Sequence, residues 1–221
     1  MDCLPLLASV LSNQYGVTVE IGGSEAYTDG KTIHLPALPL DSEPELITMI
    51  KGYCDHESAH IRETDFEILR KANLTPFQHN LFNILEDWRV EERLSARYPG
   101  CRENFRYLIQ KLFGTQKAGD TNPAFSILNA ILLTVRSWSV DAIIPRRESV
   151  AKTMERHYPG LRKALDGILD RVKDSCKDTG DCIRYALELE QATLAWSLEQ
   201  KSITEPEKED SGAAQDESVA S

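Results

Sequence analysis

The most informative part of the sequence is SEPELITMIKGYCDHESAHI, residues 42–61. Apolar side chains recur along it at helical spacing, and this periodicity predicts an amphipathic helix. Ser42 and Glu45 have the spacing of a capping box, and Pro44 between them suits a first helical turn. The helix is therefore expected to begin near residue 43.

The same stretch contains an H-E-x-x-H motif, formed by His56, Glu57 and His60. Residues four apart lie ~40° apart around an α-helix and ~6 Å apart along it, so the two imidazoles can share a metal ion. Glu57 can then accept a proton from a metal-bound water. Zinc is the expected ion, because two histidines and one further ligand leave a coordination position open for that water. The alternative is a pair of surface histidines beside a solvated glutamate, and the helical context favours the metal site.

A second helix is expected to supply the third protein ligand. Thr75 and Gln78 form another capping-box pair, and Pro76 occupies the first helical position. This helix should run to about Arg97, where a Tyr-Pro-Gly sequence stops it.

Glu86 is the expected third ligand. Two apolar residues bracket it on a second, semi-buried face of this helix, where a carboxylate is costly unless it is paired or bound to a metal. Asp87 lies nearer the flank of the helix, and Asp87 and His79 are the alternative ligands. A pairing of Glu86 with Arg89 would explain the buried carboxylate without a metal.

Three segments carry a resemblance to a known family. They are GYCDHESAH (residues 52–60), TDF (64–66) and NILEDWRVE (83–91), and they resemble the zincin-like region of cobaltochelatase T-subunit-like proteins. The resemblance covers roughly residues 15–135 and rests on the order and spacing of the H-E-x-x-H and L-E-D-x-R blocks.

That resemblance implies a metallopeptidase-like site with His56, His60 and Glu86 as metal ligands and Glu57 as the catalytic carboxylate. Larger family members continue into a von Willebrand factor A domain, which needs a D-x-S-x-S loop, and no such sequence occurs here. Cobalt insertion and partnership with an ATPase subunit are therefore implied less strongly than a stand-alone hydrolase.

The sequence thus predicts an α+β, mostly helical, zincin-like zinc metallopeptidase. Zinc would lower the pKa of its bound water to ~7 and polarise the scissile carbonyl, and Glu57 would pass the proton to the leaving amine. Asp65, Asp55 and Asp87 are candidates for carboxylates that orient the ligands from outside, with solvation of helix ends as the alternative for the first two. An enzyme also needs a donor to the transition state. The candidates are His157, Tyr158 and Arg136.

Two other functions stay open at this point. The metal site could be a structural or binding element of a partner or scaffold protein in a chelatase-like assembly, or the substrate could be a non-peptide amide. Glu57 favours catalysis, because a purely structural site does not need a carboxylate between its ligands. The expected partner is therefore a protein or peptide substrate, with a further protein partner as a second expectation.

Three regions are expected along the chain. Residues 1–118 should form the zincin-like domain, and residues 119–201 a helical extension packed on it. Residues 202–221 hold six acidic residues against one lysine and few large apolar side chains, which predicts a disordered acidic tail.

Short elements are expected before the motif helix. A helix near residues 3–13 should lead into a strand at 17–21, and a small hairpin should end in a strand at 31–35. This last strand is the candidate for a cleft-lining edge to which an extended substrate could add.

Composition limits the compartment and the partners. With 221 residues, 41% of them hydrophobic, the chain can bury a core, and its net charge of −10 argues against a nucleic-acid surface. The N-terminus lacks the basic region of a secretory signal, and the apolar stretch 124–138 is too short to span a membrane, so a cytoplasmic protein is expected. Five scattered cysteines indicate a reducing compartment. Cys176 and Cys182 could meet across a turn, although two free thiols are expected.

Overall fold

The computed structural model describes residues 3–37, 39, 42–114 and 122–204. In these ranges helices predominate over one small sheet. The helices are α1 (Leu4–Ser12), α2 (Pro44–Glu63), α3 (Phe66–Ala72), α4 (Pro76–Arg97), α5 (Pro99–Phe113), α6 (Pro123–Arg136), α7 (Ile144–His157), α8 (Leu161–Ser175) and α9 (Thr179–Thr204), with a 3-10 turn at Asp141–Ile143. The α+β, mostly helical class is thus confirmed, while the zincin-like assignment stays a prediction.

Prolines and caps determine where several helices begin. A proline lies in the first turn of α2, α4, α5 and α6, where a backbone N–H is not needed. The capping box of α4 is confirmed, since the Gln78 N–H donates to Thr75 Oγ1 at 3.3 Å and the Thr75 N–H donates to Gln78 Oε1 at 2.9 Å. The box expected at Ser42 is wrong. Glu43, not Ser42, is the N-cap of α2, and it makes no side-chain cap. The Ser42 hydroxyl donates to the carbonyl of Pro39.

The sheet has three short strands near the N-terminus. They are β1 (Thr18–Ile21), β2 (Tyr27–Thr28) and β3 (Thr32–Leu35). β3 lies in the middle, parallel to β1 and antiparallel to β2. The expectation that residues 31–35 offer a free edge is therefore wrong, because β3 pairs on both sides. On the face toward α2, Ile33 and Leu35 are completely buried.

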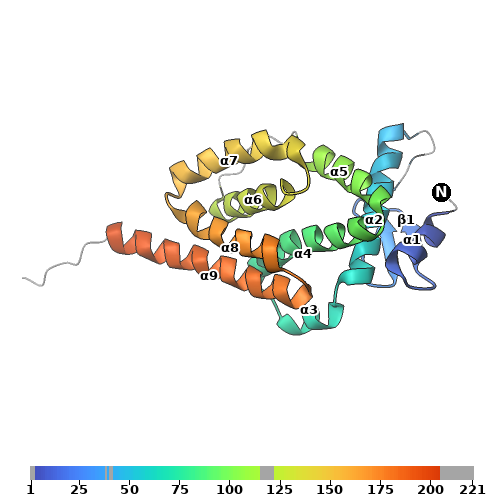
Figure 1. Cartoon of the computed structure of the whole chain (residues 1–221), viewed down its shortest axis with the longest axis horizontal. Coiled ribbons are helices and arrows are strands. Elements are labelled where there is room, and N and C mark those ends of the chain that lie inside the picture. The colour runs from blue at the N-terminus through green and yellow to red at the C-terminus, as the bar shows by residue number, and fades with distance from the viewer. Residues whose placement is uncertain (1–2, 38, 40–41, 115–121, 205–221) are drawn as a thin grey trace, which may run out of the picture.

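Three groups of buried side chains hold the elements together. One lies where α1 and the sheet pack on α2, a second where α2, α5 and α6 meet α4, and the largest lies between α4, α6, α8 and α9. Figure 1 shows α4 running through the middle, with α1 and β1 at one end of the molecule and α7, α8 and α9 toward the other. The division after residue 118 stays a prediction, and α4 packs on helices from both sides of it.

The last helix reaches into the predicted tail. α9 continues to Thr204, so residues 202–204 are helical rather than part of a tail. The remainder of the predicted tail, residues 205–221, lies outside the described residues. Among the helices placed by the structure, none has both the length and the apolar character that crossing a bilayer requires.

Candidate metal centre

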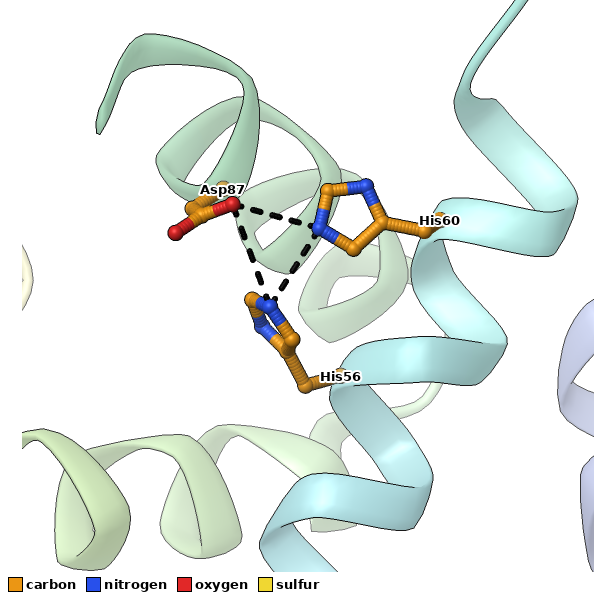
Figure 2. Close-up of side chains that lie close together, drawn as sticks. All are labelled: His56, His60 and Asp87. Carbon is orange, nitrogen blue, oxygen red and sulfur yellow. Dashed lines mark hydrogen bonds and ion pairs between the residues drawn. The ribbon is translucent and has the colours of Figure 1, made fainter. Parts of the chain in front are cut away.

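The two motif histidines and one aspartate meet where α2 packs on α4. His56 and His60 extend from successive turns of α2 toward Asp87 of α4 (Figure 2). The Nε2 atoms of the two histidines lie 3.3 Å apart. Asp87 Oδ1 is 3.2 Å from Nε2 of His60 and 3.8 Å from Nε2 of His56. The three potential ligand atoms thus all lie within 4.8 Å of one another.

This spacing suits a zinc ion. Zinc binds histidine nitrogen and carboxylate oxygen at about 2.0–2.2 Å with tetrahedral geometry, which places ligand atoms about 3.3–3.6 Å apart. The three separations in the structure run from 3.2 to 3.8 Å and so lie in or close to that range. Two nitrogens and one oxygen would fill three coordination positions and leave the fourth open.

Each imidazole is also oriented by a hydrogen bond on its far side. Nδ1 of His56 lies 2.8 Å from Glu91 Oε1, and Nδ1 of His60 lies 3.0 Å from Thr64 Oγ1. When both Nδ1–H groups donate to these oxygens, the Nε2 lone pairs face Asp87 and each other. This is the tautomer that metal ligation through Nε2 requires, and such outer partners are typical of metal-binding histidines.

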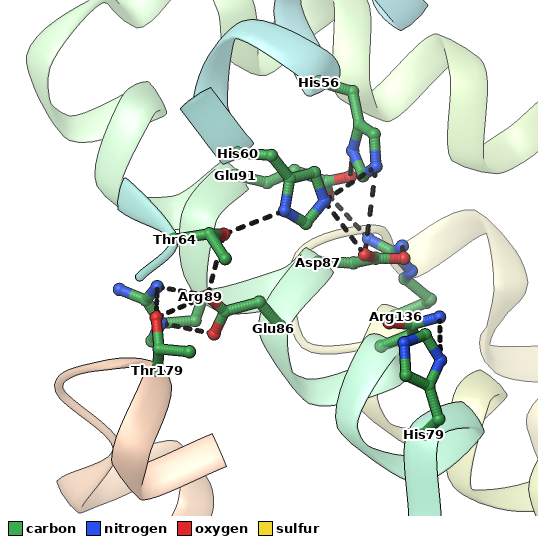
Figure 3. A network of polar contacts seen from close by, with 11 residues as sticks. His56, His60, Thr64, His79, Glu86, Asp87, Arg89, Glu91, Arg136 and Thr179 are labelled. Atoms are coloured by element: carbon green, nitrogen blue, oxygen red, sulfur yellow. Dashed lines mark hydrogen bonds and ion pairs between the residues drawn. The ribbon is translucent and has the colours of Figure 1, made fainter. Parts of the chain in front are cut away.

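Arg136, at the end of α6, connects the carboxylates around the cluster (Figure 3). Its Nη1 donates to Glu91 Oε2 at 2.7 Å, and its Nη2 donates to Asp87 Oδ2 at 2.9 Å. Burial acts to raise the pKa of Asp87. The hydrogen bond from His60 and the charges of His56 and Arg136 outweigh burial and hold this pKa well below its ordinary value of 3.8. Asp87 therefore stays ionised and aimed at the histidines.

In the absence of a metal ion, a proton can occupy the cluster. Burial acts to lower the pKa of His56, but the hydrogen bond with Glu91 and the charge of Asp87 outweigh it and raise this pKa to about 9. A metal ion has to displace that proton, because histidine binds metals in its neutral form.

Glu86, the expected third ligand, points away from the histidines. It is completely buried, and its carboxylate accepts hydrogen bonds from Arg89 Nη2 at 2.7 Å and Arg89 Nε at 2.9 Å. The hydroxyls of Thr64 and Thr179 each donate to its Oε1 at 2.9 Å. Burial acts to raise the pKa of Glu86, and the hydrogen bonds and charge of Arg89 outweigh it and hold the pKa below its ordinary value of 4.5. The pairing with Arg89 explains the buried carboxylate, and Asp87 takes the place expected for Glu86.

Glu86 nevertheless supports the cluster from one step further out. The Thr64 hydroxyl lies between His60 and Glu86, 3.0 Å from His60 Nδ1 and 2.9 Å from Glu86 Oε1 (Figure 3). It can accept from the imidazole and donate to the carboxylate. The roles expected of the two neighbouring acids are thus exchanged, because Asp87 faces the histidines and Glu86 holds the residue that orients His60.

Two other expected outer carboxylates do not reach the histidines. Asp65 caps α3 by accepting from the backbone N–H groups of Glu67 and Ile68 at 3.0 and 2.9 Å. Asp55 accepts from the side-chain amide of Asn104 on α5 at 2.7 Å. The carboxylate of Asp65 thus serves as a helix cap. The carboxylate of Asp55 joins α2 to α5.

The cluster opens onto a pocket of about 380 Å³. His56 and Asp87 line it together with Glu57, which is 5% exposed. Burial raises the pKa of Glu57, against the opposing charges of His56 and His60. Apolar side chains of α5, among them Leu108, form another wall. His56 and Asp87 of the candidate metal centre therefore border a space that can admit a small group.

The other sequence candidates lie in different places. Of the three possible transition-state donors, Arg136 is at the cluster, whereas His157 ends α7 and Tyr158 packs edge-on against Trp196 of α9 at 5.7 Å between ring centres. His79 is exposed near the start of α4.

Sequence patterns do not single out Glu91 and Thr64, although both contact the motif histidines. Helical spacing is the signal that could have found them. Glu91 follows Asp87 by four residues on α4, and Thr64 follows His60 by four residues at the end of α2.

Fold and site together define a mostly helical α+β protein with a small mixed sheet and a candidate metal centre of two histidines and one aspartate. Residues 2–221 match the family described as cobalamin biosynthesis protein CobT, and the chain belongs to this family. The match confirms the resemblance to cobaltochelatase T-subunit-like proteins and supports a chelatase-related role in cobalamin biosynthesis. No curated protein and no solved structure matches the chain.

The family corrects the interpretation of the protein as a protease or other hydrolase. That interpretation rested on Glu57 between two histidines, a pattern shared with metallopeptidases. The family points instead to cobalamin biosynthesis and chelatase-related function. An H-E-x-x-H helix places two imidazoles on one face, but this placement alone does not define a reaction.

Proposed function

We propose that this protein is a metal-containing partner subunit of a chelatase-related assembly, and that His56, His60 and Asp87 hold one zinc ion in it. The observation that carries the proposal is the convergence of three ligand atoms within 4.8 Å in a chain matched over nearly its whole length by the family. The outer hydrogen bonds to both histidines support it, because they present Nε2 to the cluster.

The charges around the cluster also favour a cation. The carboxylates of Glu25, Glu57, Asp87 and Glu91 line the pocket, and among its described lining residues Arg136 is the single arginine or lysine beside them. An excess of negative charge in a half-buried space is unfavourable unless a positive ion or a proton compensates for it. A divalent ion on the histidines would provide that compensation.

The proposed role of the zinc ion is to join two helices and keep one coordination position open toward the pocket. Its nitrogen ligands come from α2 and its oxygen ligand from α4, so binding would fix the walls of the pocket relative to each other. The residues of this chain would then present a defined surface to a protein partner, with no step of hydrolysis assigned to Glu57.

Metal analysis tests the site. The full chain, purified without chelator, is expected to carry about one zinc ion, and His56→Ala or His60→Ala should abolish it. Zinc should also displace cobalt(II) in competition, as the general order of affinities for nitrogen and oxygen sites predicts. A folded wild-type protein that cannot take up zinc would contradict the proposed metal site.

Partner capture tests the role. Immobilised wild type is expected to retain chelatase subunits from a cobalamin-producing lysate, and His56→Ala should lose them together with the metal. Glu57→Gln keeps every proposed ligand, so it should retain both metal and partner. Capture by His56→Ala at the wild-type level would show that partner binding does not depend on the metal.

A further inference from the structure

Two cysteines face each other at the corner between α8 and α9. Cys176 follows the last turn of α8, Cys182 lies in the first turn of α9, and their Sγ atoms are 3.3 Å apart. We propose that Cys176 and Cys182 are a modification site, which forms a reversible intramolecular disulfide by exchange with a low-molecular-weight disulfide such as oxidised glutathione. This proposal is independent of the metal centre.

The corner holds the two sulfurs in place. The Cys182 N–H donates to the Asp178 carbonyl at 3.2 Å, the Lys177 N–H to Asp181 Oδ2 at 2.9 Å, and the Asp181 N–H to Asp178 Oδ1 at 2.9 Å. A disulfide bond measures about 2.05 Å, so the sulfurs need to approach by little more than about 1 Å. Rotation of the side chains can supply this movement while the backbone of the corner is kept.

The two thiols differ in access. Cys182 is completely buried, whereas Cys176 is half-buried. The hydrogen bond with Cys176, burial and the nearby Glu86 carboxylate all raise the pKa of Cys182 well above its ordinary value. An external reagent should therefore meet Cys176 first, and Cys182 should react only with a sulfur already placed beside it.

The exchange balances in two steps. The Cys176 thiolate attacks one sulfur of oxidised glutathione, forms a mixed disulfide and releases one glutathione thiolate. Cys182 then gives up its proton to solvent, attacks Cys176 Sγ and releases the second glutathione. The protein loses two protons and two electrons in total, and oxidised glutathione is reduced to two molecules of glutathione.

The other cysteines provide internal controls. Burial raises the pKa of Cys54 and of Cys101 to about 12, and among the described residues the sulfur–sulfur hydrogen bond is the one between Cys176 and Cys182. Cys3 is exposed and lies in the N-terminal region. These three positions should not form an intramolecular disulfide, although Cys3 can accept glutathione.

The test is incubation of the folded full chain with oxidised glutathione, blocking of free thiols and peptide mass spectrometry. Wild type is expected to show Cys176 joined to Cys182, with a mass lower by about 2 Da and with reversal by reduced glutathione. Cys182→Ser should instead keep glutathione on Cys176, because no second thiol can release it. Cys176→Ser should leave Cys182 unmodified, and Cys3→Ser should behave like wild type at the pair.

Cys182→Ala serves in place of the serine variant if the buried hydroxyl prevents folding, because it keeps the site apolar. The proposal is overturned if wild type retains glutathione on Cys176 without joining it to Cys182. It is equally overturned if Cys176 stays a free thiol while exposed Cys3 reacts.

Discussion

Glu86 and Asp87 are neighbours in the sequence and lie in opposite environments. Glu86 is 0% exposed, and its carboxylate accepts hydrogen bonds from Arg89 and from two threonine hydroxyls. The Asp87 side chain keeps 25% of its surface exposed, borders the pocket and faces two imidazoles. One step along a helix turns the side chain by about 100°, and this rotation separates the two environments.

The difference shows that a buried carboxylate is not by itself evidence for a metal ligand. The guanidinium of Arg89 neutralises the charge of Glu86, and the hydrogen-bond donors to this carboxylate all come from the protein. The region around Glu86 therefore does not need a metal ion. Around Asp87, one guanidinium, that of Arg136, is shared with Glu91, so the histidine nitrogens and the remaining acid charge still need a cation or a proton. The Glu86 region is therefore expected to govern stability and the Asp87 region to govern metal binding.

The largest expected effect concerns stability. Glu86→Gln should lower the free energy of unfolding of the metal-free protein by about 3 kcal/mol, because Arg89 is left as a buried charge without its counter-ion. Asp87→Asn should cost less than half as much, since its environment is partly open to water. Urea denaturation followed by circular dichroism measures both.

The double variant Glu86→Gln with Arg89→Met is the control for this effect. It removes both charges, so it should recover more than half of the lost stability. Equal losses in Glu86→Gln and Asp87→Asn would mean that the two regions do not differ in the way described.

A smaller effect is expected on zinc affinity when the outer partners of the histidines are changed. Glu91→Gln and Thr64→Val should each weaken zinc binding by about 10-fold, because His56 keeps only an uncharged, weaker acceptor and His60 loses its hydroxyl acceptor. Competition with a chromophoric chelator measures this. Glu92→Gln is the matched control, since its carboxylate accepts from Ser139 and not from a histidine, and it should bind zinc like wild type.

The Glu86 region should also respond to acid. Its folded pKa lies below the ordinary value of 4.5, so its contribution to stability is fully present above that pH and is lost as the pH falls through the folded pKa. The difference in unfolding free energy between wild type and Glu86→Gln should therefore be constant above pH 4.5 and shrink below it. A difference that grows in acid would contradict the pairing with Arg89.

The smallest effect is expected at Asp65. Asp65→Ala should cost about 1 kcal/mol of stability through loss of the α3 cap and leave zinc affinity unchanged. Thermal unfolding and the chelator competition can be run on the same sample. A clear loss of zinc would show that Asp65 supports the metal centre after all.

Much of the fold could be predicted from local signals in the sequence. Thr75 and Gln78 mark the start of α4 because capping is a property of a few neighbouring residues, and prolines mark other helix starts in the same way. The order of the strands could not be predicted, because the pairing of β3 with both neighbours depends on contacts between separate segments.

In the candidate site too, local features could be predicted from the sequence, whereas contacts between distant segments could not. His56 and His60 share a helix, so their spacing was sufficient to place them together. The choice between Glu86 and Asp87 depended on where Arg89 and Thr179 lie, and Thr179 is distant in the sequence. Arg136 reaches Asp87 from another helix, and its role there also needed the structure.

The most direct test of the account is the zinc affinity of Asp87→Asn against that of Glu86→Gln, measured on the folded full chain by chelator competition. Asp87→Asn should weaken zinc binding by at least about 100-fold, because an amide is a poorer ligand than a carboxylate and the charge is lost. Glu86→Gln, which acts only through Thr64, should weaken it by less than about 10-fold. The reverse order, with the greater loss in Glu86→Gln while Asp87→Asn binds like wild type, would contradict the assignment of the metal centre.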